Sequence, residues 1–492
     1  MGEDALIAKR IDKISQLRAR GVSPYSNNFR VDIGTKQIRD RFDSLSADEL
    51  ASLNEEFALA GRIITRRDFG KATFFHLKDG SGMLQAYISR DTVSEDTYFL
   101  LKKLDIGDIV GIKGRPFRTR TGELTIEVHS LTLLTKALRS LPEKWHGLTD
   151  IEIRHRQRYL DLLANPEVKE VFVKRARMVE FIRRFLTARG FLEVETPMMQ
   201  DIPGGAAARP FKTYHNALGI ELFLRIAPEL YLKRLLVGGM DRVFEINRSF
   251  RNEGISSEHN PEFTMLEFYM AYADYHDLMS LTEEMFSSLA LEIFSRAGIS
   301  FQGNEIDLTP PWQRLSLRQA LIDKGGVAER ILDDPGQLIQ MCQELGVPLE
   351  PGEGAGKALT TLFEKLVEEK LIQPTFVIDY PVEVSPLAKR SEKDPEVVER
   401  FELFIAGKEI GNAFSELTDP LDQRERFVEQ ARKRPAEEAV SVDEDFLAAL
   451  EYGMPPAAGE GIGIDRLVML FTDSPSIREV VLFPQLRPVR GK

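Results

Sequence analysis

Hydrophobic and polar positions alternate with a period of two from about residue 57 to residue 134. Short runs of this kind, such as "ATFFHLKD" and "MLQAYISR", are separated by the glycine-rich turns "DGSG" and "RTGE" and predict five β-strands. One helical segment near Glu95–Lys103 interrupts them. This order predicts a small closed barrel of the OB type over residues 57–135, although another small β-barrel fits the same pattern.

Helical spacing predominates on both sides of this region. Residues 1–56 predict an N-terminal helical extension, whose helix at 4–20 carries several basic residues. Residues 136–165 combine turn signals with dense charge and predict a linker. A long amphipathic helix over 167–189 follows, and Gly190 ends it.

Beyond this helix, strand-like and helical segments fill the rest of the chain. "FLEVETPMM" predicts a strand that Pro197 ends, and further strands are predicted at 221–226, 241–251 and 263–270. Residues 274–370 predict a mostly helical insertion. Strands joined mainly by hairpins, with helices packed outside, predict an α+β domain over 166–492 that is built on a mainly antiparallel sheet.

The predicted strand at 263–270 is largely apolar on both faces but carries one acidic residue. Read with a period of two, one face carries Phe263, Met265, Glu267 and Tyr269. A carboxylate in the middle of such a strand needs a partner of opposite charge or a hydrogen-bond donor. Glu267 is therefore a candidate binding residue.

Two charged residues come just before the loop of this hairpin. Arg251 and Glu253 are two positions apart, so we expect them to share a strand face. A guanidinium suits a phosphate or a carboxylate, and a flat aromatic ring suits a base. The hairpin could thus present both groups to one ligand. The alternative is a cross-strand ion pair on a solvated face of the sheet.

The segment "RFELFIAGKEIGNAFSEL" places two carboxylates, Glu402 and Glu409, in otherwise apolar runs. Paired carboxylates near a phosphate site favour Mg²⁺, which prefers carboxylate and phosphate oxygens. The alternative is that they form surface ion pairs with Arg400 and Lys408. Further along the segment, one strand face carries Asn412, Phe414 and Glu416.

Near the end of the chain, "GEGIGIDRLVML" predicts a glycine-rich strand that leads into a helix beginning around Asp465 and Arg466. A helix N-terminus favours an anion, and Arg466 would add a second guanidinium to the site. The glycines do not have the spacing of a dinucleotide-binding loop. The alternative is that they allow a helix to pack closely on a sheet.

Composition narrows the class of protein. The 492 residues exceed one ordinary domain, and 43% hydrophobic with 29% charged residues suits a soluble globular protein. Cys342 is the only cysteine, which excludes internal disulfides and thiolate zinc sites. We find neither an apolar run long enough to cross a membrane nor a signal peptide, and we expect a cytoplasmic protein.

The net charge of −12 is unevenly distributed along the chain. Residues 1–135 carry +2 and the rest of the chain carries −14, so a polyanion would meet the least repulsion at the N-terminal part.

Three of these segments, taken in order, resemble the three sequence motifs of class II aminoacyl-tRNA synthetases. "FLEVETPMM" resembles motif 1, "FRNEGISSEHNPEFTMLE" motif 2 and "GIGIDRLVMLF" motif 3. Within the subgroup that has an N-terminal OB domain, "RIAPELYLKRL", "DYPVEVSPLA" and "FSELTDP" are most similar to lysyl-tRNA synthetases. The resemblance extends from about residue 5 to residue 492. It implies ATP-dependent attachment of L-lysine to tRNA(Lys) through a lysyl-adenylate, with release of AMP and diphosphate.

The resemblance also implies roles for individual residues. For catalysis it assigns Arg251 to the α-phosphate and the substrate carboxylate, and Arg466 to the γ-phosphate or the adenine. The other ATP-binding residues would be Glu253, His259, Asn260 and Phe263. Lysine would be bound by Gly205, Glu229, Glu267, Tyr269, Asn412, Phe414 and Glu416. Mg²⁺, up to three ions per active site, would be bound in part by Glu402 and Glu409. The anticodon would contact Arg62, Phe74 and Gln85, and a homodimer would form through the motif 1 region.

Two departures from the family pattern concern the same region. Gly411 and Ala413 exchange small residues around Asn412, and Glu258 replaces a residue that is often Arg or Thr. Three other functions fit the sequence less well. A non-catalytic RNA-binding relative is disfavoured by the intact arginines and glutamates, a ligase that lysylates proteins by the presence of the barrel, and an aspartate or asparagine enzyme by the acidic pocket, which suits a cationic side chain.

Overall fold

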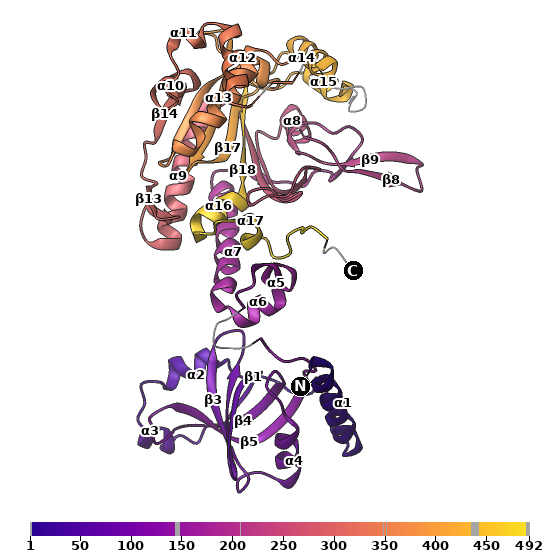
Figure 1. Cartoon of the computed structure of the whole chain (residues 1–492), viewed down its shortest axis with the longest axis vertical. Coiled ribbons are helices and arrows are strands. Elements are labelled where there is room, and N and C mark those ends of the chain that lie inside the picture. The colour runs from indigo at the N-terminus through magenta and orange to yellow at the C-terminus, as the bar shows by residue number, and fades with distance from the viewer. Residues whose placement is uncertain are drawn as a thin grey trace. The chain divides into compact units, whose positions relative to one another are not determined.

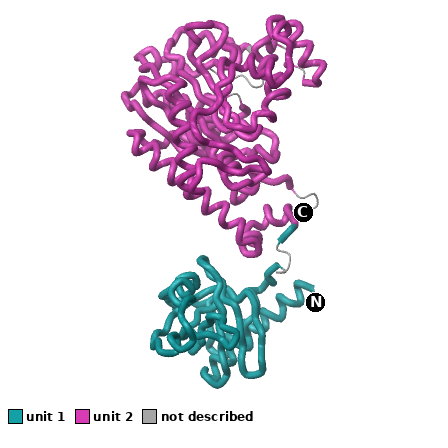
Figure 2. Tube along the Cα trace, turned by 90° about the vertical axis from the view of Figure 1, so that its left-hand side faces the viewer, with its two compact units in different colours: residues 1–149 teal, residues 150–492 magenta. Residues whose placement is uncertain are grey.

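The computed structural model describes residues 2–142, 148–206, 208–347, 349–350, 352–433 and 442–488. The chain divides into two compact units, Met1–Thr149 and Asp150–Lys492 (Figure 2). The boundary falls within the stretch 136–165, of which residues 143–147 lie outside the described residues. No helix in the described part of the chain is both long and apolar enough to cross a membrane.

Unit 1 is a closed five-stranded barrel, which confirms the prediction of an OB-type fold. The strands lie in the order β1-β2-β3-β5-β4. Their bounds are Phe57–Phe69 for β1, Ala72–Lys78 for β2, Met83–Ser89 for β3, Ile109–Arg118 for β4 and Leu124–Thr135 for β5, with α4 (Glu95–Lys103) between β3 and β4. Alternate residues of β2 are buried, so the period of two in the sequence separates the inside of the barrel from its surface.

Three helices precede the barrel, namely α1 (Glu3–Ala19), α2 (Thr35–Phe42) and α3 (Ala47–Ser52). The basic residues of α1 are partly used within unit 1. Buried Arg10 donates to the carbonyl oxygens of Ile106, Ala137 and Arg139, and Lys13 Nζ lies 2.6 Å from Asp105 Oδ1. These contacts fix the helix to the barrel.

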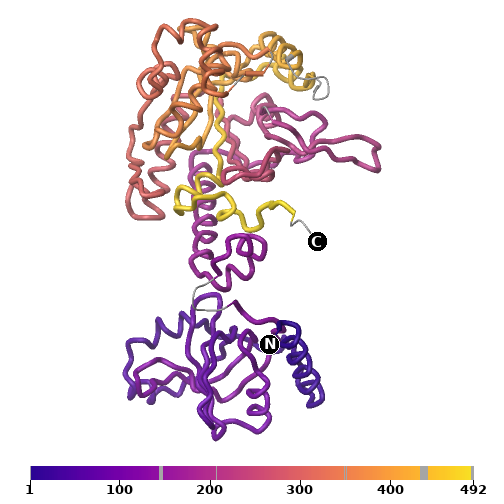
Figure 3. Tube along the Cα trace, viewed as in Figure 1, coloured from indigo at the N-terminus to yellow at the C-terminus, as the bar shows by residue number. Residues whose placement is uncertain are grey.

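Unit 2 is built on an eight-stranded sheet in the order β14-β15-β16-β17-β18-β11-β10-β6 (Figure 1). The strands are β6 (Leu192–Glu193), β10 (Arg242–Phe250), β11 (Glu262–Ala271), β14 (Gln313–Ser316), β15 (Thr375–Pro381), β16 (Val397–Ile405), β17 (Lys408–Ser415) and β18 (Ala457–Gly463). Only the outermost pairs, β14 with β15 and β10 with β6, are parallel. The mainly antiparallel α+β fold is therefore confirmed. Figure 3 shows how β18, late in the chain, lies between the earlier strands β17 and β11.

The main hydrophobic core lies between this sheet and the helices α7 (Pro166–Thr187), α9 (Tyr275–Phe294) and α16 (Ile464–Thr472). Met178, Phe268, Leu289 and Ala458 are fully buried there. A second layer, α8 (Glu229–Val237) and α15 (Glu444–Glu451), shares a smaller core with Tyr269 of β11. Since Phe268 and Tyr269 are neighbours on one strand, these two cores lie on opposite faces of the sheet.

The remaining elements surround this framework. The helices are α5 (Ile151–Arg156), α6 (Arg158–Ala164), α10 (Leu317–Asp323), α11 (Glu329–Leu332), α12 (Pro335–Glu344), α13 (Ala355–Leu366), α14 (Pro420–Lys433) and α17 (Ile477–Val480), with 3-10 turns η1 (Glu368–Lys370) and η2 (Val382–Val384). The smaller sheets are β12 (Gly298–Phe301) with β13 (Asn304–Asp307), and β7 (Met199–Gln200) with β9 (Ile220–Leu224) and β8 (Lys212–His215). The predicted helical insertion thus also contains short strands.

The predicted strand "FLEVETPMM" is wrong as a continuous element. The structure has two short pieces, β6 and β7, which belong to different sheets. Between them Thr196 donates to Glu245, and Pro197 has no N–H for a ladder. The chain therefore leaves one sheet and enters the other at this point.

Candidate active site

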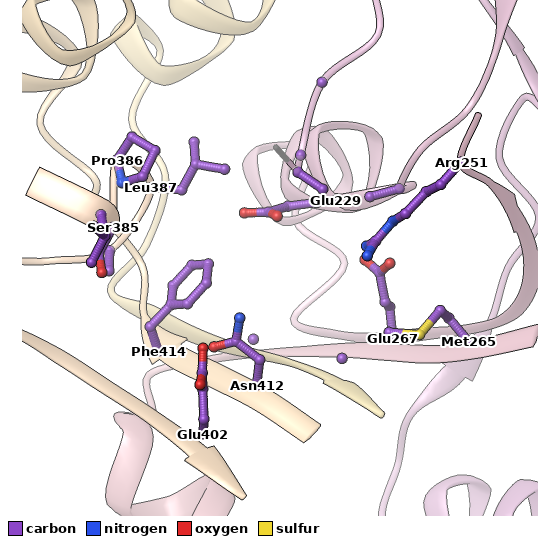
Figure 4. Close-up of a pocket in the computed structure, with 18 of the residues that line it drawn as sticks. Glu229, Arg251, Met265, Glu267, Ser385, Pro386, Leu387, Glu402, Asn412 and Phe414 are labelled. Atoms are coloured by element: carbon purple, nitrogen blue, oxygen red, sulfur yellow. The ribbon is translucent and has the colours of Figure 1, made fainter. Parts of the chain in front are cut away.

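A cavity of about 890 Å³ opens in unit 2. Strands β11, β16, β17 and β18 contribute to its lining, together with α8 and the first turn of α16. Predicted site residues that line it are Gly205, Glu229, Arg251, Glu253, His259, Asn260, Phe263, Glu267, Tyr269, Glu402, Glu409, Asn412, Phe414 and Arg466. Figure 4 shows Glu229, Arg251 and Glu267 directed into it from different elements. The folding of unit 2 thus brings together residues that lie up to 261 positions apart.

The glycine-rich strand β18 forms the floor of the cavity. A Cβ on Gly459 would lie 2.2 Å from the ring of Tyr269 and 2.4 Å from Glu416 Oε1, and one on Gly461 would lie 3.2 Å from Met265. These side chains fill the space above the strand. The glycines are therefore needed mainly for the cavity, and only Gly463, beside Arg466, lies at the junction with α16.

Three buried carboxylates lie at the cavity: Glu229 and Glu267 line it, whereas Glu416, a predicted lysine ligand, is not one of its lining residues and lies beside Gly459. Glu229, Glu267 and Glu416 are all at least nine-tenths buried, and Tyr269 donates a hydrogen bond of 3.3 Å to Glu267. Burial, reinforced by the charge of Glu229, raises the pKa of Glu267 to about 8. Burial raises the pKa of Glu416 to about 8 as well, although Lys233 opposes this effect. Such a site gains most from a ligand that brings positive charge.

Lys233 is a site residue that the sequence analysis missed. Its Nζ atom lies 2.6 Å from Glu229 Oε1 and 2.5 Å from Glu416 Oε2. The pattern "ELYLK" places it one helical turn after Glu229, and this spacing is the signal that could have identified it. Lysine on a helix more often indicates a solvated face, which is why the pattern alone did not reveal it.

The loop between β10 and β11 brings Arg251 to the cavity. The Arg251 guanidinium lies over the Phe263 ring, 5.1 Å from its centroid, and among the described residues its buried Nε has no hydrogen-bond partner. The prediction that Arg251 and Glu253 share a strand face is wrong, because β10 ends at Phe250. The backbone N–H of Asn252 donates to Arg209 O, which draws the chain out of the sheet and leaves Glu253 exposed.

His259 and Asn260 hold this loop in place from within. The His259 ring lies 3.0 Å from Ser256 Oγ and 3.4 Å from the Arg466 guanidinium. The side chain of buried Asn260 donates to Glu262 O and accepts from the backbone N–H of Gln485. Asn260 therefore supports the loop with both ends of its amide group.

The two predicted metal ligands lie on neighbouring strands. Glu402 accepts from Arg400 at 2.5 Å and from Tyr380 at 2.7 Å, and Glu409 Oε2 lies 3.2 Å from Arg466. Glu402 does pair with Arg400, but both side chains are largely buried, so this is not the surface ion pair that was the alternative. Among the residues that the structure describes, no three Asp, Glu, His or Cys side chains are arranged as a metal site.

A further carboxylate, which the sequence analysis missed, belongs to this group. Burial and the charges of Glu409 and Glu364 raise the pKa of Glu368, on η1, to about 7. Its position after a helix gave no sequence signal of proximity to β17. Carboxylates that raise one another's pKa form a region in which a cation would be stabilised.

In unit 1, aromatic rings form a row on the outer face of the barrel. Successive ring centroids from Phe69 through Phe74 and Tyr87 to Phe117 are 6.0, 4.8 and 5.8 Å apart. Phe75, the neighbour of Phe74, is 1% exposed and belongs to the barrel core. Phe74 is thus outside that core, which the sequence alone could not decide.

The other two predicted anticodon residues make hydrogen bonds within unit 1. Gln85 lies on β3 two residues before Tyr87, on the same face. Its amide donates to Glu123 at 2.8 Å and accepts from Thr125 at 2.9 Å. Arg62 donates to Gly107 O at 2.8 Å. Both side chains keep further hydrogen-bonding capacity for a ligand, since Arg has five N–H donors and the Gln amide has two.

A family model for class II tRNA synthetases (D, K and N) matches residues 150–487, and one for an OB-fold nucleic acid binding domain matches residues 57–134. The chain belongs to the class II tRNA synthetases. Similar proteins are named Lysine--tRNA ligase in Carboxydothermus hydrogenoformans (55% identical, 98% of both chains) and Moorella thermoacetica (56% identical, 99% of this chain and 98% of the other). A heat-inducible Lysine--tRNA ligase of Escherichia coli is 52% identical over 98% of this chain and 96% of its own.

The unusual Glu258 of this synthetase has a partner. Its carboxylate forms a short ion pair with Lys408, at the start of β17. Although burial alone would raise the pKa of Glu258, the hydrogen bond from Lys408 lowers it, so the group stays ionised. The negative charge is therefore compensated, and the pair joins the motif 2 loop to the strand that carries Glu409.

The exchange of small residues around Asn412 is explained by a second unexpected carboxylate in the synthetase. Glu460 of β18 is 1% exposed and accepts a hydrogen bond of 2.6 Å from Thr282 of α9, on the core side of the sheet. A Cβ on Gly411 would lie 3.3 Å from Glu460 Oε1, and Ala413 is the direct cross-strand neighbour of Glu460. Glycine at 411 thus leaves room for this carboxylate.

Glu460→Gln is expected to stabilise unit 2 at alkaline pH. Burial raises the pKa of Glu460 from its ordinary value of 4.5 to about 8, so the native state binds the proton more tightly than the unfolded state. Stability contributed by this proton is complete below pH 4.5 and is lost as the pH rises to about 8. The variant should gain about 4 kcal/mol at pH 8 and about 1 kcal/mol at pH 5. Thermal unfolding at both pH values measures this, and equal shifts at both would contradict it.

Proposed function

We propose that this synthetase attaches L-lysine to tRNA(Lys), with ATP as co-substrate, through a lysyl-adenylate and with release of AMP and diphosphate. The observation that carries the proposal is that buried carboxylates, Glu229 and Glu267, line the same cavity as Arg251 and Phe263. A diamino acid with a carboxylate at one end complements this distribution of charge. The proposed substrates imply action in the cytoplasm.

In the proposed complex, lysine lies along the floor formed by β18. Glu229 and Gly205 receive the α-ammonium group, and Arg251 and Asn412 receive the carboxylate. Gly205 has φ +84° and a Cβ there would lie 3.0 Å from Glu229 Cβ, so glycine allows this close approach. The ε-ammonium group meets Glu416, Glu267 and Tyr269, while Phe414 packs against the aliphatic stem. Both ammonium groups of lysine are then paired with carboxylates away from water.

ATP occupies the other end of the cavity in this proposal. Phe263 stacks on the adenine, and Glu253 accepts a hydrogen bond from the adenine amino group. His259, Asn260 and Arg466 lie beside the phosphates. Arg251 neutralises the α-phosphate as the lysine carboxylate attacks the α-phosphorus in line and diphosphate leaves. No protein nucleophile is needed, since positioning and charge neutralisation lower the barrier. The adenylate then passes its lysyl group to the terminal ribose of tRNA.

The acidic group around Glu409 suits Mg²⁺, up to three ions per site. Burial is the main cause of the raised pKa of Glu368, and the negative charges of Glu409 and Glu364 add to it. Glu402 and Glu409 would hold the ions, which would neutralise phosphate charge when bound. Each oxygen of Glu402 accepts one hydrogen bond, from Arg400 or from Tyr380, and keeps a second lone pair for a cation.

ATP–pyrophosphate exchange against a panel of amino acids tests the proposal. Lysine should support exchange, whereas aspartate and asparagine should not. Rejection of an uncharged isostere of lysine is expected to be of order 10⁴, because the isostere leaves buried carboxylates unpaired. Exchange with aspartate or asparagine, or none with lysine, would contradict it. Transfer of lysine to a tRNA(Lys) transcript rather than to protein then excludes a protein ligase.

Glu402→Gln and Glu409→Gln are each expected to raise the Mg²⁺ concentration for half-maximal exchange about tenfold, since each removes one charged ligand. The matched control is Glu369→Gln, an exposed residue of η1. A Mg²⁺ titration of pyrophosphate exchange gives the result. Titrations that match wild type for both variants would leave these carboxylates with a structural role only.

Phe74→Ala is expected to weaken binding of the anticodon hairpin by about 1–3 kcal/mol, the value of one lost base stack. The melting temperature and pyrophosphate exchange should stay unchanged, because Phe74 lies outside the barrel core and adenylate formation occurs in unit 2. Binding of a fluorescent anticodon hairpin provides the measurement. Phe75→Ala is the contrasting control and should unfold the barrel. Hairpin binding that survives both Phe74→Ala and Gln85→Ala in folded protein would contradict the assignment, which also includes Arg62.

We also propose a homodimer through the motif 1 region. Leu192, Met198 and Met199 in this segment are about half exposed, which is costly for large apolar side chains. A second copy of the chain would cover them. Sedimentation of the protein and of a Met198→Lys/Met199→Lys variant distinguishes a dimer, which the variant should weaken, from a monomer.

A further inference from the structure

Lys233 does not line the cavity itself but contacts three residues of the proposed lysine site, Glu229, Glu416 and Phe414. Its side chain is fully buried, and its Nζ atom bridges Glu229 Oε1 at 2.6 Å and Glu416 Oε2 at 2.5 Å. The same Nζ lies 5.2 Å from the centroid of the Phe414 ring. Lys233 thus contacts the residues proposed for both ends and for the stem of the substrate.

The bridge uses one oxygen of each carboxylate and leaves the other for a ligand. Glu229 Oε2 faces Gly205, since a Cβ there would lie 3.6 Å from it. Glu416 Oε1 faces Gly459 at 2.4 Å from the corresponding Cβ position and, though buried, has no hydrogen-bond partner among the described residues. Two acceptors therefore remain, one at each proposed ammonium site.

We propose that Lys233 is a positioning residue that fixes the separation of the two ammonium sites and so sets the length of the diamino acid that is activated. The inference rests on the proposed function and deepens it. Glu229 and Lys233 are one turn apart on the same helix, so their relative position is rigid. Glu416 reaches the site from the end of β17 and is tied to that helix through the Lys233 ammonium group.

The charges support the same role. Glu229, Glu267 and Glu416 could carry three negative charges, and Lys233 with the two ammonium groups of lysine would balance them. Burial alone would lower the pKa of Lys233, but Glu229 and Glu416 raise it, so the bridge stays charged. Without it, repulsion between the carboxylates would separate them or favour their neutral forms, and neither arrangement holds two ammonium groups at a fixed spacing.

The test compares Lys233→Met, which keeps the length but removes the charge, with Lys233→Arg, which keeps the charge. Arg234→Met is the matched control, because Arg234 is the next residue of the helix and pairs with Asp443 and Asp445 instead. Pyrophosphate exchange is measured with lysine, with ornithine, which is one methylene shorter, and with homolysine, which is one longer. Thermal unfolding shows whether each variant is folded.

Lys233→Met should raise the KM for lysine at least 100-fold, change the KM for ATP less than about twofold, and reduce the preference for lysine over ornithine at least tenfold. Lys233→Arg should bring the KM for lysine part of the way back to the wild-type value. It should also change the order of preference among the three diamino acids, since the larger guanidinium separates the two carboxylates. A folded Lys233→Met with an unchanged lysine-to-ornithine ratio would overturn the proposal. If that variant does not fold, an unchanged order for Lys233→Arg would do so.

Wild type serves to separate this inference from the proposed function. Lysine-dependent exchange by wild type supports the proposed function whatever the variants do. Absence of such exchange in wild type would overturn the function and the inference together. If wild type is active with lysine but the Lys233 variants keep its preference among the three diamino acids, only the role of Lys233 is overturned.

Discussion

Glu416→Gln should lower kcat/KM for lysine in pyrophosphate exchange by about 3–5 kcal/mol, on the order of 10²–10³-fold or more. The side chain is 2% exposed, and the change replaces a carboxylate by an amide of nearly equal size. Both the substrate ammonium group and Lys233 would lose a charged acceptor in a site that excludes water. The KM for ATP should stay close to that of wild type, because the nucleotide is proposed to bind at the other end of the cavity.

Glu460→Gln is the matched control for this result. Glu460 is equally buried and its pKa is also raised to about 8, but its side chain points to Thr282 on the opposite side of the sheet. It should leave lysine activation unchanged. Exchange by Glu416→Gln within a few-fold of wild type, or an equal loss in both variants, would show that Glu416 does not bind the ε-ammonium group.

Local patterns in the sequence were sufficient for the barrel and for most strands of unit 2. The period of two in β2 survives as alternate burial, and the predicted helix at Glu95–Lys103 is α4. The edge strands were harder to predict, because β6 is only two residues long and is defined by its pairing with β10. Because β6 and β10 are about 50 residues apart in the sequence, no local pattern indicates that they pair.

The candidate site could be predicted where family motifs carry it and not where tertiary contacts do. Residues such as Arg251 and Glu402 stand in recognisable motifs. The ion pair of Glu258 with Lys408 joins residues 150 positions apart. Lys233 was missed because a lysine on a helix usually lies on a solvated face, whereas this one pairs with buried Glu416. Glu460 stands between two glycines, so its sequence gave no indication that it points away from the cavity into the core.

Arg251→Lys should slow adenylate formation by about 3–4 kcal/mol, on the order of 10²–10³-fold. The guanidinium is held against the Phe263 ring, and its planar fork can bind two oxygens at once. The lysine side chain of the variant keeps the charge but has no planar pair of donors, so it cannot hold the substrate carboxylate and the α-phosphate in line. Single-turnover formation of the adenylate measures the loss directly, separate from transfer to tRNA.

Arg248→Lys on the same hairpin provides the control. Arg248 is 42% exposed and pairs with Glu262 at 3.5 Å, outside the cavity, so its replacement should change the rate less than twofold. The effect of Arg251→Lys should appear mainly in the rate of the chemical step, because the guanidinium is proposed to compensate charge that develops on the α-phosphate. A variant with a normal single-turnover rate and only a raised KM for lysine would instead restrict Arg251 to binding the carboxylate. In that case Arg466, together with the proposed Mg²⁺, would have to provide the neutralisation, and Arg466→Lys would then show the larger loss.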